Sequence, residues 1–172
     1  AKVSPSQVQV VWLKQAIAHP SEPFPESART LLGKLRTIVE HLEAKLQNLR
    51  MIYVSSRSYA GFSRDTLNPE PFAYESAFAV RWLVEERMRT EAGPGRAWLS
   101  WGPYLWADGV VPRKDGLSFD ARDFQEDGCH PSKAGVDKAA RRLFDFFTSD
   151  ATARPWFVQE RHERHQSEET KP

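Results

Sequence analysis

The chain has 172 residues, of which 40% are hydrophobic and 27% charged, a composition typical of one globular domain with its own core. Its 24 basic and 23 acidic side chains nearly cancel, so the net charge of +1 gives no reason to expect a nucleic acid or an anionic membrane as a partner. The single cysteine, Cys129, excludes a disulfide within the chain. No apolar run reaches the roughly 18 residues of a membrane span, and residues 1–6 show no signal-peptide core. We therefore expect a soluble protein of unassigned localisation.

Short apolar segments alternate with amphipathic ones along the first part of the sequence. Residues 8–13 and 51–54 are apolar and rich in β-branched side chains, which predicts two buried strands. Between them, the leucines of residues 26–46 recur at helical spacing, which predicts a helix with one apolar face. Residues 72–89 predict a second helix, and residues 97–101 predict a third strand.

The rest of the chain is interpreted as a long loop, a closing helix and a polar tail. Residues 102–128 show no regular periodicity, and a loop of that length is usually functional or an insertion. Ser132 has the side chain of an N-cap for a helix over residues 132–147. We assign residues 1–157 to one domain and predict that the charged tail, residues 158–172, is disordered.

The predicted order of elements is β-α-β-α-β-α, the alternation expected of a parallel sheet covered by helices. We expect a small doubly wound α/β fold of three strands with helices on both faces. In such folds the chemistry lies at the carboxyl ends of the strands. Here those ends are Lys14-Gln15, Ser55-Ser56-Arg57 and the loop that follows Trp101.

The most informative segment precedes the closing helix and reads Asp127-Gly128-Cys129-His130-Pro131-Ser132. A histidine that acts as a base needs an acceptor on its other ring nitrogen. Asp127 can supply that acceptor to His130 across a turn that Gly128 permits. The sequence therefore predicts a histidine presented on a short rigid turn. A surface turn with an incidental aspartate and histidine is the alternative.

This pattern, followed by Gly135 and an amphipathic helix, resembles the last sequence block of the SGNH (GDSL-like) serine hydrolases. The resemblance covers the C-terminal part of a family domain, from its third strand onward. It implies a flavodoxin-like three-layer fold, here truncated, and a triad in which His130 is the general base and Asp127 orients it. On this interpretation the protein is an ester hydrolase, weak and promiscuous, that acts on a small-molecule ester without a cofactor.

The chain departs from the family in its nucleophile block. The family places its serine in a Gly-Asp-Ser turn after the first strand, and no such turn is found in this sequence. The Gly-x-Asn-Asp block is replaced by Lys14-Gln15-Ala16 after the strand at residues 8–13. Gln15 is a candidate amide donor in place of the family's Asn, or simply a polar residue at a strand end. Arg57 is a candidate ligand for an anionic group of the substrate.

Several groups are candidates for the missing nucleophile. Ser55 and Ser56 end a central strand at the correct rim, where His130 could activate one of them. No Gly-x-Ser-x-Gly elbow frames them, and hydrogen bonding at the strand end is the alternative. Cys129 is adjacent to His130, and neighbouring side chains usually point apart. A water activated by His130 would also serve, with a modest rate enhancement.

The sequence leaves two alternative functions open and also predicts a homodimer. The missing nucleophile block motivates a non-catalytic remnant or binding module of the same fold. A metal-assisted hydrolase with His130 as a ligand is the third hypothesis, although no metal site is assigned, and His162 and His165 in the tail are one residue short of zincin spacing. Without the family's first strands, the edge strand at residues 8–13 would be bare, so we predict a twofold homodimer that covers it.

Overall fold

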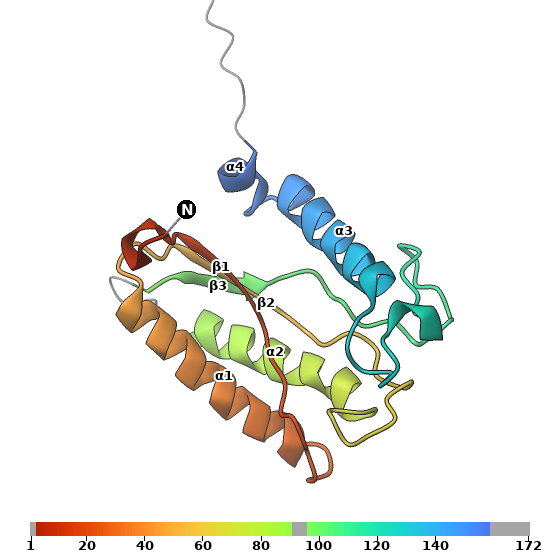
Figure 1. Ribbon diagram of the computed structural model, residues 1–172. Helices are drawn as coiled ribbons and strands as arrows, with labels where there is room; N and C mark the ends of the chain where they lie inside the picture. The colour runs from red at the N-terminus through yellow and green to blue at the C-terminus, as the bar shows by residue number, and fades with distance from the viewer. Residues whose placement is uncertain (1–2, 91–95, 159–172) are drawn as a thin grey trace, which may run out of the picture.

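The computed structural model describes residues 3–90 and 96–158. Its elements in chain order are η1 (Pro5–Gln7), β1 (Val10–Lys14), α1 (Glu26–Lys45), β2 (Met51–Ser55), α2 (Phe72–Arg89), β3 (Trp98–Trp101), η2 (Ala121–Asp123), α3 (Lys133–Ser149) and α4 (Arg154–Phe157) (Figure 1). Every predicted strand and helix is found, with bounds that differ by two residues at most. Of the tail predicted to be disordered, residues 159–172 lie outside the described residues.

The three strands form one parallel sheet in the order β1-β2-β3. Helices α1 and α2 lie against one face of this sheet, and α3 lies on the other (Figure 1). The fold is thus the small doubly wound α/β arrangement expected from the alternation of elements, with β2 in the centre. Among the described helices, none combines the length and the hydropathy that crossing a membrane requires.

The main core lies between the sheet and the helix pair α1/α2. Because successive side chains of a strand point to opposite faces, Ile52 and Val54 enter this core while Tyr53 points to α3. The buried residues of the same core come from the four other elements of this layer, β1, α1, α2 and β3: Leu13, Leu31, Leu32, Leu35, Val39, Ala79, Val80, Leu83, Val84 and Leu99. The leucine spacing of α1 thus reports a genuine buried face.

The opposite face is packed more sparsely, by aromatic contacts from α3. The ring of Tyr53 meets those of Phe146 and Phe147 edge-on, at centroid distances of 5.1 and 5.7 Å. The outer side of α3 leaves Val136 and Phe144 exposed. The segment predicted as a long irregular loop has a small core of its own, made by Ala107, Leu117, Phe119 and Phe124.

The two edges of the sheet differ in what they expose. On β1, the predicted dimer edge, Val10, Val11 and Trp12 are half-buried. On β3, the opposite edge, the side chains of Trp98 and Trp101 are 57% and 37% exposed. The more exposed apolar surface of the sheet therefore lies on β3, and the homodimer through β1 stays a prediction.

Candidate functional site

The carboxyl ends of the strands and the segment before α3 meet at one rim of the sheet. Lys14 ends β1 in register with Ser55, which ends β2. Arg57, two residues beyond β2, donates from Nη2 to the sulfur of Cys129 at 3.5 Å. The segment that carries His130 therefore reaches the rim where chemistry was expected.

His130 is held on a tight turn that only glycine can make. Gly128 donates its N–H to the carbonyl of Gln125 at 2.9 Å, and Gln125 donates to the carbonyl of His130 at 2.8 Å. Gly128 has a φ of +69°, in the left-handed region. A Cβ at this position would lie 1.8 Å from the carbonyl oxygen of Phe62. The turn is therefore fixed both by its own backbone and by the loop beneath it.

Asp127 orients the imidazole of His130. Its Oδ2 lies 2.5 Å from Nδ1 of the ring, and its Oδ1 accepts the backbone N–H groups of Cys129 and His130, each at 2.9 Å. The hydrogen bond from His130, followed by those from the two amides, lowers the pKa of Asp127 to about 2. The side chain of His130 is 59% exposed. With Nδ1 engaged, Nε2 is the ring nitrogen open to another partner.

The start of α3 is anchored immediately after this turn. Ser132 is the N-cap, as predicted, and its hydroxyl accepts from the N–H of Gly135 at 3.4 Å while donating to the carbonyl of Arg122 at 2.7 Å. Asp123 in η2 is buried and accepts from Nζ of Lys138 at 2.6 Å. These contacts tie α3 to η2 and so fix the direction in which the turn leaves His130.

The two candidate serines are placed at the rim but face inward. Ser55 and Ser56 are 2% and 1% exposed. The hydroxyl of Ser55 accepts from Nε1 of Trp12 at 2.9 Å, and that of Ser56 accepts from the N–H of Leu105 at 3.4 Å. Among the described residues neither hydroxyl is hydrogen-bonded to His130. Both serines make the strand-end hydrogen bonds that were the alternative interpretation.

Gln15, Arg57 and Lys14 complete the rim. Gln15 is exposed and its side chain makes no hydrogen bond with the described residues. Arg57 is brought next to the turn, as its contact with Cys129 shows. Lys14, which the sequence marks only as a strand end, is half-buried: burial first, and then the charge of Arg57, lower its pKa to about 8. A lysine that closes an apolar strand was the signal in the sequence.

The described part of the chain offers no set of ligands for the metal hypothesis. Within residues 3–90 and 96–158, no group of three or more histidine, cysteine, aspartate and glutamate side chains is arranged to hold an ion. The tail histidines, His162 and His165, lie outside the described residues.

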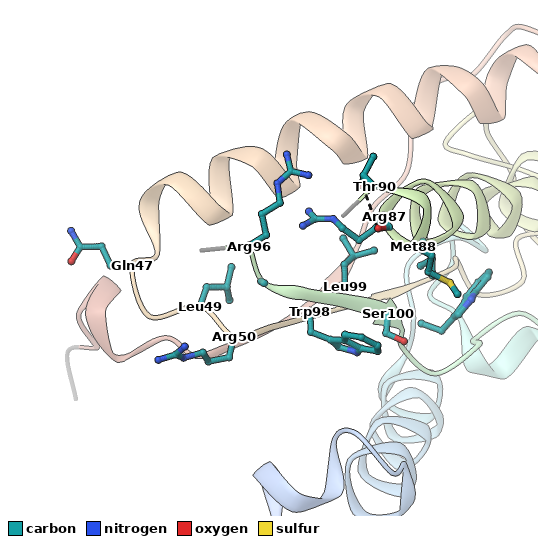
Figure 2. A pocket seen from close by; sticks show the side chains of 13 residues that line it. Gln47, Leu49, Arg50, Arg87, Met88, Thr90, Arg96, Trp98, Leu99 and Ser100 are labelled. Carbon is teal, nitrogen blue, oxygen red and sulfur yellow. Dashed lines mark hydrogen bonds between the residues drawn. The ribbon is translucent and has the colours of Figure 1, made fainter. Parts of the chain in front are cut away.

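A wide apolar groove of about 970 Å³ lies at the far edge of the sheet, away from the His130 turn. Figure 2 shows Trp98, Leu99 and Ser100 of β3 along it, with Arg87 and Met88 of α2 on its other side. No residue of the Asp127–His130 pair lines it. The groove therefore offers apolar surface without the acid–base pair.

Comparison of the chain with protein-family models, with curated proteins and with solved structures finds no match. The interpretation of the site consequently depends on the residues and geometry of the rim.

Proposed function

We propose that this protein hydrolyses small-molecule esters, with His130 as general base and Asp127 as the carboxylate that orients it, and that it is a divergent relative of the SGNH hydrolases. The observation that carries the proposal is the 2.5 Å contact between Asp127 Oδ2 and His130 Nδ1, on a turn where two backbone amides donate to the other oxygen of the same carboxylate. The site fixes the ring orientation that a base requires.

The chemistry follows from that orientation. When Nδ1–H of His130 donates to Asp127, Nε2 carries the free lone pair. Nε2 takes a proton from the attacking hydroxyl as its oxygen bonds to the ester carbonyl carbon. The resulting imidazolium, stabilised by the Asp127 carboxylate, then returns the proton to the leaving alkoxide. With water as the nucleophile, one ester and one water become one acid and one alcohol.

Water is the nucleophile that fits the described residues best. Ser55 and Ser56 are almost fully buried and their hydroxyls are already engaged. An activated water needs only Nε2 of His130, whose side chain is 59% exposed, and room beside it. General-base catalysis of this kind accelerates a reaction by about 100-fold to 10,000-fold, so we expect a slow enzyme.

The first test measures release of p-nitrophenol from p-nitrophenyl acetate by purified wild-type and variant proteins. We expect His130→Ala to lose at least about 100-fold in kcat/KM, and Asp127→Asn to lose part of that. His41→Ala, on the solvent side of α1, is the matched control, because the exposed ring of His41 bonds only the carbonyl of Thr37 among the described residues. Equal rates for wild type and His130→Ala would refute the proposal.

Ser55→Ala separates water from serine as the nucleophile. A water mechanism predicts turnover close to wild type, whereas a loss as large as that of His130→Ala would identify Ser55 as the nucleophile. Ser56→Ala is tested in the same way. Each variant is compared with wild type by circular dichroism, because both serines are buried and each hydroxyl holds a hydrogen bond.

A binding module without turnover is the second candidate function. It is favoured by the same burial of Ser55 and Ser56, which leaves no exposed serine at the ends of β1 and β2. Saturable binding of an ester without release of its alcohol would support this function over hydrolysis.

A further inference from the structure

We propose that Lys14 and Arg57 form a binding site for a small oxyanion, a carboxylate or a phosphate, beside Cys129 at the carboxyl-terminal rim of the sheet. The site adjoins the Asp127–His130 turn but does not depend on hydrolysis there.

The backbone fixes the position of both cations. Lys14 is the last residue of β1 and pairs in register with Ser55. It shares a strand face with Trp12, whose Nε1 donates to the Ser55 hydroxyl, so Lys14 and Ser55 lie on the α3 side of the sheet. Arg57 follows two residues after Ser55, and its backbone N–H is held by the hydroxyl of Ser76 at 3.0 Å.

The thiol of Cys129 orients the guanidinium. Its sulfur lies 3.2 Å from the carbonyl oxygen of Leu67, to which the S–H donates, and 3.5 Å from Nη2 of Arg57. The sulfur therefore accepts from Arg57 while its own proton is engaged elsewhere. A neutral thiol is a weak acceptor, so this contact directs the guanidinium without neutralising its charge.

The two cations have no carboxylate partner among the described residues. Other partly buried bases are paired: Arg87 with Glu43 at 3.0 Å, and Lys138 with Asp123 at 2.6 Å. Neither Lys14 nor Arg57 makes an ion pair within residues 3–90 and 96–158. In addition, Nε of Arg57 is buried and has no hydrogen-bond acceptor there. A buried N–H and two unneutralised positive charges are costly together, and one oxyanion would satisfy both.

The electrostatic effect is visible on Lys14 itself. Its pKa is lowered to about 8, first by burial and then by the charge of Arg57. The charged form of Lys14 is therefore disfavoured at this rim. An anion between Lys14 and Arg57 would favour the charged form and raise the pKa. An oxyanion fits better than a halide, because a guanidinium presents its N–H groups as a fork that matches two oxygens.

Binding of inorganic phosphate to the full chain tests the proposal directly, with ionic strength held constant by sodium chloride so that screening does not change. We expect saturable binding by calorimetry, weakened about tenfold or more in Lys14→Met and in Arg57→Gln. Lys34→Met and Arg141→Gln remove exposed cations of α1 and α3, and both should bind phosphate like wild type.

A second readout does not require the variants to fold. The Cε–Hε signals of ¹³C-labelled lysine report the pKa of Lys14 in the wild-type protein, and phosphate should raise that pKa. Binding that is unaffected in Lys14→Met and Arg57→Gln, or a Lys14 pKa that phosphate leaves unchanged, would overturn the proposal. Because neither readout uses ester turnover, an inactive hydrolase that binds phosphate at these residues would refute the proposed function and leave this site intact.

Discussion

The two faces of the sheet are used differently. The face under α1 and α2 is closed by interlocking aliphatic side chains, and Leu35, Ile52 and Val54 there are at most 1% exposed. The face under α3 is covered by one helix, which meets the sheet through aromatic contacts to Tyr53 and leaves Phe144 62% exposed. Lys14 and Ser55 lie at the carboxyl-terminal rim on this second side, and the Asp127–His130 turn leads directly into α3.

Because successive side chains of a strand point to opposite faces, each strand contributes to both sides of the sheet. In β2, Ile52 and Val54 enter the aliphatic core, while Tyr53 and Ser55 point to the α3 side. A polar group can therefore be placed at the rim without entering the layer that supplies most of the buried apolar area. Stability and the candidate chemistry should respond to different substitutions.

The largest effect is expected from truncation in the α1/α2 layer. Leu35→Ala removes a side chain that is 1% exposed and leaves a cavity between α1 and the sheet. We expect the free energy of unfolding to fall by about 3 kcal/mol. The measurement is urea denaturation followed by circular dichroism.

The matched substitution on the other side is Phe144→Ala in α3. Its ring is 62% exposed, so its loss should change the free energy of unfolding by less than about 1 kcal/mol. If Phe144→Ala proved as destabilising as Leu35→Ala, the two faces would not differ in the way that their packing indicates.

The turn that carries His130 gives the next effect. Gly128→Ala introduces a Cβ that would lie 1.8 Å from the carbonyl oxygen of Phe62, at a φ of +69°. We expect a loss of about 2 kcal/mol in the free energy of unfolding, together with loss of any activity that depends on the Asp127–His130 pair. Denaturation and the p-nitrophenyl acetate assay measure the two parts.

Gly116→Ala is the control for backbone strain alone. Gly116 has a φ of +78°, but a Cβ there would meet open space. Its cost should be about 1 kcal/mol, and any activity that depends on the Asp127–His130 pair should persist. The difference between the two glycine variants measures the contact with the Phe62 loop, and equal costs would show that this contact does not constrain the turn.

The sequence predicts the layers of the fold well because each layer depends on local periodicity. The leucine spacing of residues 26–46 and the apolar runs at residues 51–54 and 97–101 require no knowledge of distant contacts. The Asp127–His130 contact is predictable for the same reason, because the two residues are only three positions apart and Gly128 permits the turn between them. Its use as a catalytic pair stays a prediction.

What the sequence could not supply depends on contacts between distant segments. The engagement of Ser55 requires Trp12, 43 residues away, and the placement of Arg57 requires Cys129, 72 residues away. No local pattern reports such pairs. The burial of Lys14 beside Arg57 likewise depends on segments distant in the sequence, so Lys14 is noticed in the sequence only as an unusual end to an apolar strand.

A smaller effect is expected where α3 is anchored. Lys138 bonds the buried carboxylate of Asp123 at 2.6 Å and the carbonyl of Ser118 at 2.9 Å. Lys138→Met should lower the free energy of unfolding by about 1.5 kcal/mol, because it leaves Asp123 buried without its cation. Lys133→Met removes the exposed pair with Asp137 on the same helix and should have no measurable effect. Equal losses in the two variants would contradict the anchoring role of Asp123.

The smallest and most specific effect is a pH dependence at Asp127. Its pKa in the folded protein is about 2, below the ordinary value of 3.8, because His130 and two backbone amides favour the carboxylate. The pair therefore adds stability that is fully present above pH 3.8 and is lost as the pH falls from 3.8 through 2. In Asp127→Asn this contribution is absent at every pH. The free energies of unfolding of wild type and Asp127→Asn should therefore converge as the pH falls from 3.8 to 2. The pKa of Asp120, beside Arg122, is lowered similarly, but it acts equally in both proteins. Denaturation curves recorded from pH 5 downward measure the difference, and two profiles that stay parallel would show that Asp127 is not held as a carboxylate by His130.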